Sequence, residues 1–340
     1  MIQVFGPCAA ESREQVLETA RAIKEACGVL PFIYRAGVWK PRTRPDTYQG
    51  AGEEGLAWLA EVKRTLDIPV ATEVATPKHV EAALKAGIDY LWIGARTSAS
   101  PIAVSAIGVA IEDWRLKIGD LKGILIKNPV NADAKLWLGN IERLEKTGIP
   151  VIAVHRGCNH QPCWKMAHEV RLTRPDIPML LDPSHMSGDA TKVPELLKKV
   201  EELGLDGAMV EVHAHPESAL SDNAQQITPT LLRDALDPIL SRLCLVSLIC
   251  PPNGPEELNW LRAEIDELDE QLWDTIAARM DVSRRIGEWK KAHDMAPLQP
   301  ERVKVIGERL KVKGKKLNLP AEFMKQIWDI IHEESLRRQE

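Results

Sequence analysis

Six basic side chains stand at or shortly after the ends of four short apolar runs. They are Arg35, Lys40, Arg42, Arg96, Lys127 and Arg156. Brought together, such cations would cost several kcal/mol in repulsion and desolvation unless they met anions. Guanidinium forks and ammonium groups suit phosphates and carboxylates. The sequence therefore predicts one or two substrates that carry phosphate and carboxylate groups, although single cations could instead pair with Glu73, Glu211 or surface acids.

A second set of side chains offers metal ligands of mixed hardness. The set is Cys8, His185, Glu211 and Asp222. These types can hold a divalent transition metal and leave one position for a substrate oxygen. Because the four are far apart in the sequence, a buried cysteine and a turn-capping histidine are the alternative. His213 and His215 are rival ligands. A zinc site at Cys158, His160 and Cys163 is a weaker alternative, since a complete tetrahedral set is missing.

Eight short apolar runs are typical of buried strands and would position these side chains. They are Ile2–Phe5, Phe32–Arg35, Pro69–Val74, Tyr90–Ile93, Gly123–Ile126, Pro150–Val154, Met179–Leu181 and Ala208–Val212. Helical patterns lie between them at Glu14–Glu25, Glu53–Leu66, Pro77–Lys85, Ala132–Lys146, Cys163–Leu172 and Thr191–Leu203. Three of these helices close on a glycine stop, at Gly87, Gly148 and Gly204.

Eight β/α units in about 240 residues predict an α/β fold, a (β/α)8 TIM barrel. All strands of such a barrel open on one face, so the polar side chains that follow them would converge on a single site. A doubly wound sheet is the alternative. It is disfavoured because no GxGxxG motif follows any strand.

The chain of 340 residues changes in composition near residue 255. Up to that point, 28 basic and 31 acidic residues are accompanied by 18 Gly and 20 Pro. Beyond it, 16 basic and 18 acidic residues occur with only 3 Gly and 3 Pro. High charge with few helix breakers is typical of a helical module. We therefore expect a barrel at 1–243, a linker at 244–256 and an all-α domain at 257–340.

The composition also excludes several functional classes. A net charge of −5 argues against a nucleic-acid partner. No apolar run reaches the roughly 18 residues that a membrane span needs, and the N-terminal residues lack the basic and apolar regions of a signal peptide. Six scattered cysteines without a disulfide-scaffold pattern indicate a reducing, cytoplasmic setting.

The last part of the chain has the pattern of three helices. Apolar residues at three- and four-residue spacing predict one long helix over Pro255–Lys291, which could not bury its apolar stripe alone. A proline-containing break separates it from helices predicted at Glu301–Val312 and Pro320–Arg338, the last with Pro in its first turn. The pattern by itself predicts a charged three-helix dimerisation module.

The residues after the strands form motifs in a recognisable order: GPCAAES, KPRT, TEV, IGAR, DPSH and an EVH…LSD pair. In this order they resemble the 3-deoxy-D-arabino-heptulosonate 7-phosphate (DAHP) synthases of the microbial I-beta type, and the resemblance extends from Gly6 to about Pro229. The mechanistically related 3-deoxy-octulosonate 8-phosphate synthases usually lack the KPRT loop, which stands here at Lys40–Thr43. The loop therefore favours DAHP synthase.

This resemblance implies a metal-dependent, aldol-like condensation of phosphoenolpyruvate with erythrose 4-phosphate and water. It implies a divalent ion, often manganese, on Cys8, His185, Glu211 and Asp222. It implies a phosphoenolpyruvate site made of Arg35, Lys40, Arg96, Lys127 and Arg156. Glu73 would position a water, while Arg42 and Thr43 would meet erythrose 4-phosphate. Lys40 would also donate a proton near the new hydroxyl.

Two departures from the family pattern concern the neighbours of these cations. The family often has KRG after the fifth strand, where this chain has Lys127, Asn128 and Pro129. It often has an acid before the sixth-strand Arg, where this chain has His155. The charged residues themselves are retained, so we expect these changes in their neighbours to alter substrate affinity. We expect no regulatory domain before the barrel, so that feedback control would act from elsewhere.

The segment LRAEIDELDEQLWDTIAARMDVSRRIGEWK resembles the first helix of the all-helical chorismate mutases, and the match extends over all three helices. The resemblance implies an intertwined homodimer that rearranges chorismate to prephenate by holding a compact conformation with cations and donors. Its site would take Arg262 from one protomer, and the following residues from the other: Arg279, Lys290, Arg302 and Gln339. The family commonly has Glu where Val303 stands, and Gln299 or Glu301 could substitute for it.

The sequence thus predicts a bifunctional enzyme that acts on phosphoenolpyruvate, erythrose 4-phosphate and chorismate, and that dimerises through its helical domain. We also expect prephenate, or a downstream aromatic compound, to inhibit the synthase. The alternative keeps the barrel as an enzyme and makes the helical module a non-catalytic dimerisation and sensor domain. An octulosonate-type synthase is a weaker alternative.

Overall fold

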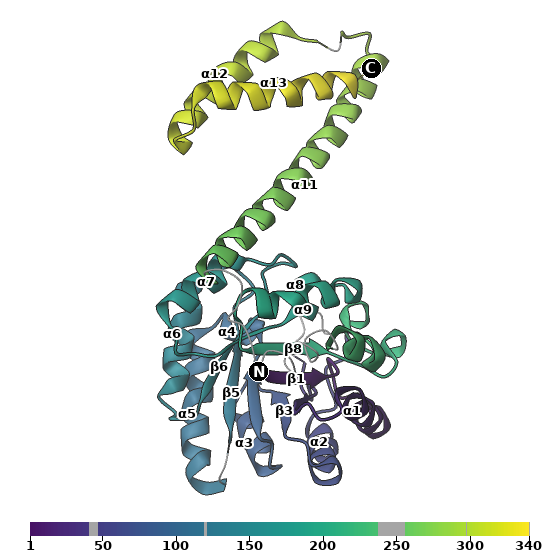
Figure 1. Cartoon of the computed structure of the whole chain (residues 1–340), viewed down its shortest axis with the longest axis vertical. Helices are drawn as coiled ribbons and strands as arrows, with labels where there is room; N and C mark the ends of the chain where they lie inside the picture. Colours follow the sequence, from purple (N-terminus) through teal and green to yellow (C-terminus); the bar gives the residue numbers. More distant parts are fainter. Residues whose placement is uncertain (41–46, 119–120, 237–255, 297, 340) are drawn as a thin grey trace, which may run out of the picture. The chain divides into compact units, whose positions relative to one another are not determined.

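The computed structural model describes residues 1–40, 47–118, 121–236, 256–296 and 298–339. It divides into two compact units, Met1–Glu264 and Ile265–Glu340, which Figure 1 colours along the sequence. The predicted linker lies outside the described residues except for Glu256, and so do Arg42 and Thr43. In the described part of the chain, no helix is long and apolar enough to cross a membrane.

Eight parallel strands close into a barrel, each paired with the next along the chain and the last with the first. They are β1 (Ile2–Gly6), β2 (Ile33–Arg35), β3 (Val70–Glu73), β4 (Tyr90–Ile93), β5 (Gly123–Lys127), β6 (Val151–His155), β7 (Met179–Leu181) and β8 (Gly207–Glu211). Among their residues only Ile2 and Tyr90 are partly exposed. This burial explains the continuous apolar runs, and the structure confirms the predicted (β/α)8 barrel.

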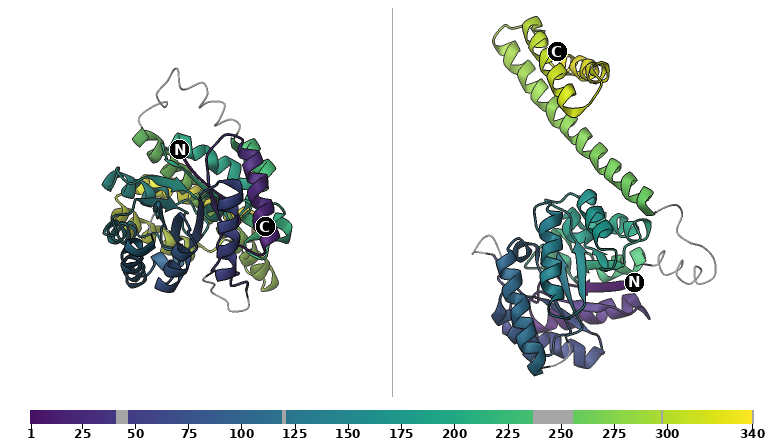
Figure 2. Two further views of the ribbon diagram at one scale, coloured as in Figure 1. Left: turned by 90° about the horizontal axis from the view of Figure 1, so that it is seen from below. Right: turned by 90° about the vertical axis from the view of Figure 1, so that its left-hand side faces the viewer.

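Helices surround the barrel, as the two views of Figure 2 show. They are α1 (Arg13–Cys27), α2 (Glu53–Leu66), α3 (Pro77–Lys85), α4 (Ala95–Ser98), α5 (Pro101–Ile118), α6 (Ala134–Glu145), α7 (Trp164–Thr173), α8 (Pro183–Ser187) and α9 (Val193–Glu202). The six predicted helices are present, and the stop residues Gly87, Gly148 and Gly204 have φ values of 76°, 69° and 61°. Helix α5 is absent from the prediction because its small and β-branched residues form no clear polar face.

The barrel interior is a packed core that leaves the chemistry to one rim. Its inner cluster consists of Val4, Ile33, Ala71, Trp92, Leu125, Ile152, Val154, Leu180 and Met209. A larger apolar cluster fills the space between strands and helices. Because the interior is filled, polar side chains at strand ends and in the following loops must meet at the carboxyl-terminal face.

A buried carboxylate ties the start of β4 to neighbouring elements. Asp89 lies 3.1 Å from Lys63 Nζ and 2.9 Å from Lys122 Nζ, and it accepts the Val70 N–H at 3.0 Å. Burial acts to raise the pKa of Asp89, but these contacts outweigh it and hold the pKa below its ordinary value. The carboxylate is therefore charged in the folded protein at neutral pH.

Helix α11 (Glu256–Ala292) begins within the first unit, and its first turns pack on α7. The Trp260 ring is stacked on His168 with 5.4 Å between centroids, and it meets Trp164 edge-on at 6.0 Å. Glu264 Oε1 lies 2.9 Å from His168 Nδ1. These contacts explain why the division between the units follows Glu264, inside the segment predicted as the helical domain.

The second unit consists of the rest of α11 together with α12 (Pro300–Leu317) and α13 (Ala321–Arg337). Helix α12 runs past its predicted end at Val312, because Gly314 is accommodated within it and Asn318 caps it in the left-handed region at φ 55°. Several large apolar side chains stay half exposed in this chain alone: Leu268, Leu272, Trp273, Ile327 and Ile330. The apolar stripe is thus incompletely covered, as the sequence pattern predicts.

Candidate active site

The predicted site residues of the barrel meet at its carboxyl-terminal rim. A cavity of about 370 Å³ opens there between the ends of the strands. Among its lining residues are Lys40, Glu73, Arg96, Lys127, Arg156, His185 and Asp222. They follow different strands, and the parallel topology alone brings them together. A concave site with several converging cations suits a small polyanionic ligand.

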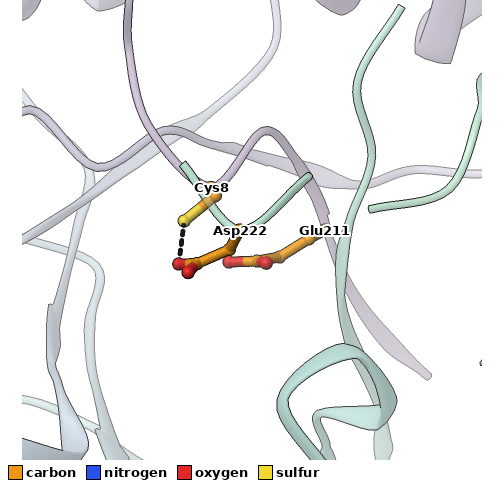
Figure 3. A group of neighbouring side chains, drawn as sticks. All are labelled: Cys8, Glu211 and Asp222. Carbon is orange, nitrogen blue, oxygen red and sulfur yellow. Dashed lines mark hydrogen bonds between the residues drawn. The ribbon is translucent and has the colours of Figure 1, made fainter. Parts of the chain in front are cut away.

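Three of the four proposed metal ligands form a compact cluster at this rim (Figure 3). One ligand atom from each of Cys8, Glu211 and Asp222 lies within 4.8 Å of the other two. The Cys8 thiol donates to Asp222 Oδ2 at 2.9 Å. His185, the fourth, lies beside the cluster, with Nε2 at 3.6 Å from Glu211 Oε1. The structure therefore brings the four residues into one neighbourhood.

The electrostatics of the cluster fit a divalent cation. Burial and then the charge of Glu211 raise the pKa of the Cys8 thiol to about 12. A bound cation reverses this balance, since a coordinated thiol loses its proton and carboxylates gain a counter-charge. With a thiol, two carboxylates and an imidazole, the donor set has the mixed hardness of a transition-metal site.

The rival ligand sets do not form such a cluster. Among the described residues, the only group of three or more His, Cys, Asp or Glu side chains close enough for an ion is the one above. His213 Nδ1 accepts the N–H of His215 at 2.9 Å, and the ring of His215 is 3.1 Å from Glu18. Cys158, His160 and Cys163 therefore do not make the zinc site considered as an alternative.

Lys40 links this cluster to the cavity. Its Nζ lies 3.0 Å from Cys8 Sγ and 3.9 Å from Glu73 Oε2. Burial acts to lower the pKa of Lys40, but the surrounding Cys8, Glu73 and Glu211 raise it above its ordinary value. The ammonium group is thus protonated at neutral pH and can act as a hydrogen-bond or proton donor.

Arg35 is held almost entirely inside the rim. One terminal nitrogen donates to Glu211 Oε1 at 3.0 Å, and the guanidinium carbon lies 4.8 Å from the Trp92 ring centroid. Within the described part of the chain, its Nε and other terminal nitrogen have no hydrogen-bond partner. The Arg35–Glu211 pair shows that the acid-pairing alternative holds for this cation in part, while two buried donors remain for an anion.

A second buried network surrounds Lys127 and His185. Lys127 Nζ lies 2.7 Å from Asp182 Oδ2, and His185 Nδ1 lies 3.0 Å from the same carboxylate oxygen. Burial lowers the pKa of both Lys127 and His185, whereas the pKa of Asp182 is far below its usual range because His185 and Lys127 outweigh its own burial. Asp182 thus orients a candidate ligand and a candidate substrate cation at once.

Several contacts at the rim escaped the sequence reasoning. Gln225 Nε2 donates to Glu211 Oε2 at 2.7 Å, and Gln226 Oε1 accepts the Cys8 N–H at 2.9 Å. In the sequence, the signal for Gln225 and Gln226 is that both closely follow Asp222. The signal for Asp182 is that it is the first residue of the DPSH motif. His155, the residue before Arg156, has its pKa lowered to about 4 by burial, so its ring is neutral at pH 7.

The second unit brings together three of its predicted site residues. Lys290 Nζ donates to Gln339 Oε1 at 2.8 Å, and Arg279 donates to the hydroxyl of Ser335. Gly287 allows this approach, since a Cβ there would lie 2.5 Å from the Cα of Gln339. The side chain of Arg302 lies outside the described residues, and its backbone belongs to α12.

Arg262 comes 17 positions before Arg279 in the sequence. It is exposed on the first turns of α11, in the first unit. Arg262 and Arg279 are separated by more than four turns of α11. One helix therefore cannot supply both side chains to a single small-molecule site.

Comparisons with known proteins match two separate parts of the chain to two families. Residues 1–238 match the family model described as the DAHP synthetase I family, and residues 261–340 match chorismate mutase type II. The phospho-2-dehydro-3-deoxyheptonate aldolase of Thermotoga maritima is 32% identical over 251 residues, which span 68% of this chain and 66% of that enzyme. The chain thus spans slightly less than two thirds of this relative.

A further relative and a solved structure are also similar to this chain over about seven tenths of its length. A 2-dehydro-3-deoxyphosphooctonate aldolase of Desulfatibacillum aliphaticivorans is 28% identical over 258 residues, spanning 71% of this chain and 91% of that enzyme. The crystal structure of the Thermotoga maritima DAHP synthase superposes with a TM-score of 0.62 at 26% identity, covering 73% of this chain and 71% of that one.

Proposed function

The chain belongs to the DAHP synthetase I family and ends in a chorismate mutase type II domain, and we propose that its barrel condenses phosphoenolpyruvate with erythrose 4-phosphate. The observation that carries this proposal is the rim cavity. Lys40, Arg96, Lys127 and Arg156 line it beside the thiol–carboxylate cluster. Both substrates are phosphorylated, and phosphoenolpyruvate adds a carboxylate, so their charge matches the cavity.

The residues of the rim divide the work as follows. Lys127 and Arg156, with the two remaining donors of Arg35, hold the phosphate and carboxylate of phosphoenolpyruvate. Protonated Lys40 donates to the oxygen that becomes the new hydroxyl, because its pKa is raised. Glu73 accepts a hydrogen of the water that adds as phosphate leaves. We assign Arg96 to the phosphates as well, and Arg42 and Thr43, outside the described residues, to erythrose 4-phosphate.

Cys8, His185, Glu211 and Asp222 would hold a divalent ion, and we propose manganese. When bound, the ion supplies Lewis acidity at the substrate aldehyde. The test is DAHP formation by the purified chain, with and without a chelator, followed by addition of each divalent metal. Loss of activity with the chelator and recovery with manganese is expected. Full activity after exhaustive chelation would contradict the assignment.

A second substrate deserves a direct comparison, since a curated relative is a 2-dehydro-3-deoxyphosphooctonate aldolase. Replacing erythrose 4-phosphate with arabinose 5-phosphate separates the two reactions. We expect a clear preference for erythrose 4-phosphate in kcat/KM, because the chain contains the KPRT residues Lys40–Thr43. A preference for arabinose 5-phosphate would assign the barrel to the octulosonate reaction instead.

We propose that the second unit rearranges chorismate to prephenate. Arg279 donates to Ser335 of α13, and Lys290 donates to Gln339 just beyond that helix, so these side chains can hold carboxylates and donate to the ether oxygen. Because Arg262 of the same helix cannot reach them, a complete site needs Arg262 from a second copy. We therefore propose a homodimer formed through the helices, which would also cover the exposed apolar side chains of α11 and α13.

A chorismate-to-prephenate assay tests this proposal. Turnover that is lost in Arg279→Ala but retained in Lys198→Ala, a surface variant of α9, is expected. No turnover in a chain whose synthase is active would instead support the non-catalytic dimerisation and sensor domain, for which Val303 in place of the usual Glu is the favouring observation. Sedimentation analysis tests the dimer, and a monomer at assay concentration would contradict the shared site.

We also propose that the protein is cytoplasmic. A separate proposal is that prephenate inhibits its synthase activity. The tethered mutase domain would be the sensor, because coupling requires two distinct sites on one molecule. We expect Arg279→Ala to abolish both mutase turnover and prephenate sensitivity while the basal synthase rate is unchanged. Sensitivity that survives in this variant would place the effector site elsewhere.

A further inference from the structure

One fully buried side chain at the rim has no role in the reaction described above. Asn128 directly follows Lys127 at the end of β5, and it faces the residues that follow β6. Its backbone N–H donates to Val154 O at 3.1 Å, which extends the β5–β6 ladder by one step beyond the strands. The residue therefore lies between two substrate cations, Lys127 and Arg156.

The amide of Asn128 makes three hydrogen bonds to backbone groups, and its Nδ2 also donates to Cys158 Sγ at 3.8 Å. Its Oδ1 accepts the N–H of Arg156 at 2.7 Å. Its Nδ2 donates to Gly157 O at 3.0 Å and to Pro129 O at 2.9 Å. An asparagine offers this combination of one acceptor and two donors, whereas Asp has no donor when ionised and Ser has only one. The pattern thus depends on the side chain that stands where the family often has Arg.

The segment held by Asn128 is conformationally unusual. Gly157 has φ +68°, and a Cβ there would lie 2.3 Å from Gln161 O. Asn159 and His160 follow with φ values of 52° and 60°, and both line the cavity. Such left-handed residues persist only where their surroundings hold them. The bonds from Asn128 fix the first peptide of this segment, and with it the direction in which Arg156 leaves β6.

We propose that Asn128 is the positioning residue of the anion site: its amide sets the spacing between Lys127 and Arg156 that phosphoenolpyruvate requires. This rests on the proposed assignment of phosphoenolpyruvate to that pair of cations. A cation pair binds a rigid phosphate and carboxylate well only at a fixed separation, because each misplaced fork loses a charge-assisted bond. The residue acts through its neighbours and does not need to touch the substrate.

The experiment compares phosphoenolpyruvate binding and kinetics in Asn128→Ala and Asn128→Ser with the wild-type full chain. Calorimetric titration of phosphoenolpyruvate gives the Kd, and the coupled assay gives KM and kcat. We expect Ala to raise the Kd and KM for phosphoenolpyruvate about 10- to 100-fold, the effect of leaving buried groups unpaired. The KM for erythrose 4-phosphate should stay within about twofold. Ser, which can still accept the Arg156 N–H, should recover part of the loss.

Thr147→Ala is the matched control for a lost buried hydrogen bond. The Thr147 hydroxyl donates to Leu144 O at 2.6 Å and accepts the Ile149 N–H at 3.2 Å. These bonds lie next to the opposite end of β6. The Thr147→Ala variant should be less stable to heat than wild type, with an unchanged Kd for phosphoenolpyruvate. An equal rise in Kd in this control, or a Kd within twofold of wild type in Asn128→Ala, would overturn the inference. If Asn128→Ala does not fold, the Ser variant decides in the same way.

The two proposals fail in different ways. If wild type neither binds phosphoenolpyruvate nor forms product, the proposed function is wrong. If wild type binds it and both Asn128 variants bind it equally well, only the positioning role is wrong.

Discussion

Replacing Trp260 with alanine should release the first turns of α11 from α7. Trp260 is 1% exposed and packs on His168 and Trp164. A buried Trp removes roughly 150–250 Å² from water, or about 4–6 kcal/mol at ~25 cal/mol per Å². Large-to-small core substitutions of this kind cost about 3–5 kcal/mol. Among the described residues its Nε1 has no hydrogen-bond partner, so the loss is one of packing.

Amide hydrogen exchange measures this loss where it occurs. If the helix undocks locally, a loss of about 3 kcal/mol or more speeds exchange of the residues at 257–264 by over about 100-fold. The free energy of global unfolding, from urea titration, should fall by no more than that amount, because undocking relieves the rest of the barrel. The rim residues lie on other elements, so the synthase rate serves as a check on folding.

Two variants control the measurement. Trp260→Phe keeps a ring in the same place and should lose less stability than Trp260→Ala, because it removes fewer buried atoms. Leu172→Ala removes a side chain of α7 that is 64% exposed, and should change stability by no more than about 0.5 kcal/mol. Exchange at 257–264 within threefold of wild type in Trp260→Ala would refute the packing argument, as would an equal loss in Leu172→Ala.

Three further outcomes are expected. Gly94→Ala should reduce synthase kcat more than tenfold in a folded protein, because a Cβ there would lie 2.1 Å from Glu73 Oε1; an unchanged rate would show that Glu73 can move without effect. Asp89→Asn should be less stable than wild type at pH 6, and the difference should shrink in urea titrations as the pH falls through the lowered pKa of Asp89, below 3.8; a constant difference would contradict the ion pairs. Cys8→Ser should weaken manganese binding in calorimetry while circular dichroism is unchanged, and wild-type affinity would remove the thiol from the ligand set.

Local patterns were sufficient for the architecture. Each strand is buried on both faces, so its residues form a continuous apolar run, as Gly123–Ile126 does before β5 ends at Lys127. The helices between them are amphipathic and end at residues such as Gly204, which adopts a left-handed conformation with little strain. Both signals lie within about a dozen residues, which is why the barrel and most of its helices were predictable. Helix α5 lacked such a signal.

The site was predictable only as a list of residues. Repetition after successive strands indicated that Cys8, Glu211 and their companions share one rim, since parallel strands in a barrel point the same way. The hydrogen-bond and packing partners of these side chains could not be predicted from the sequence. Asn128 contacts Arg156, and Trp260 contacts α7, only in the folded chain.

By itself, then, the sequence determined the barrel, the three helices and the chemical types gathered at the rim, because these depend on short-range periodicity and on the phase of polar residues after strands. Only the tertiary structure decided which charges are paired and which donors remain for a ligand. Arg35 illustrates the difference: its charge is evident in the sequence, but Glu211, 176 positions away, satisfies one of its nitrogens. Such pairing depends on burial and distance between remote segments, which no local pattern encodes.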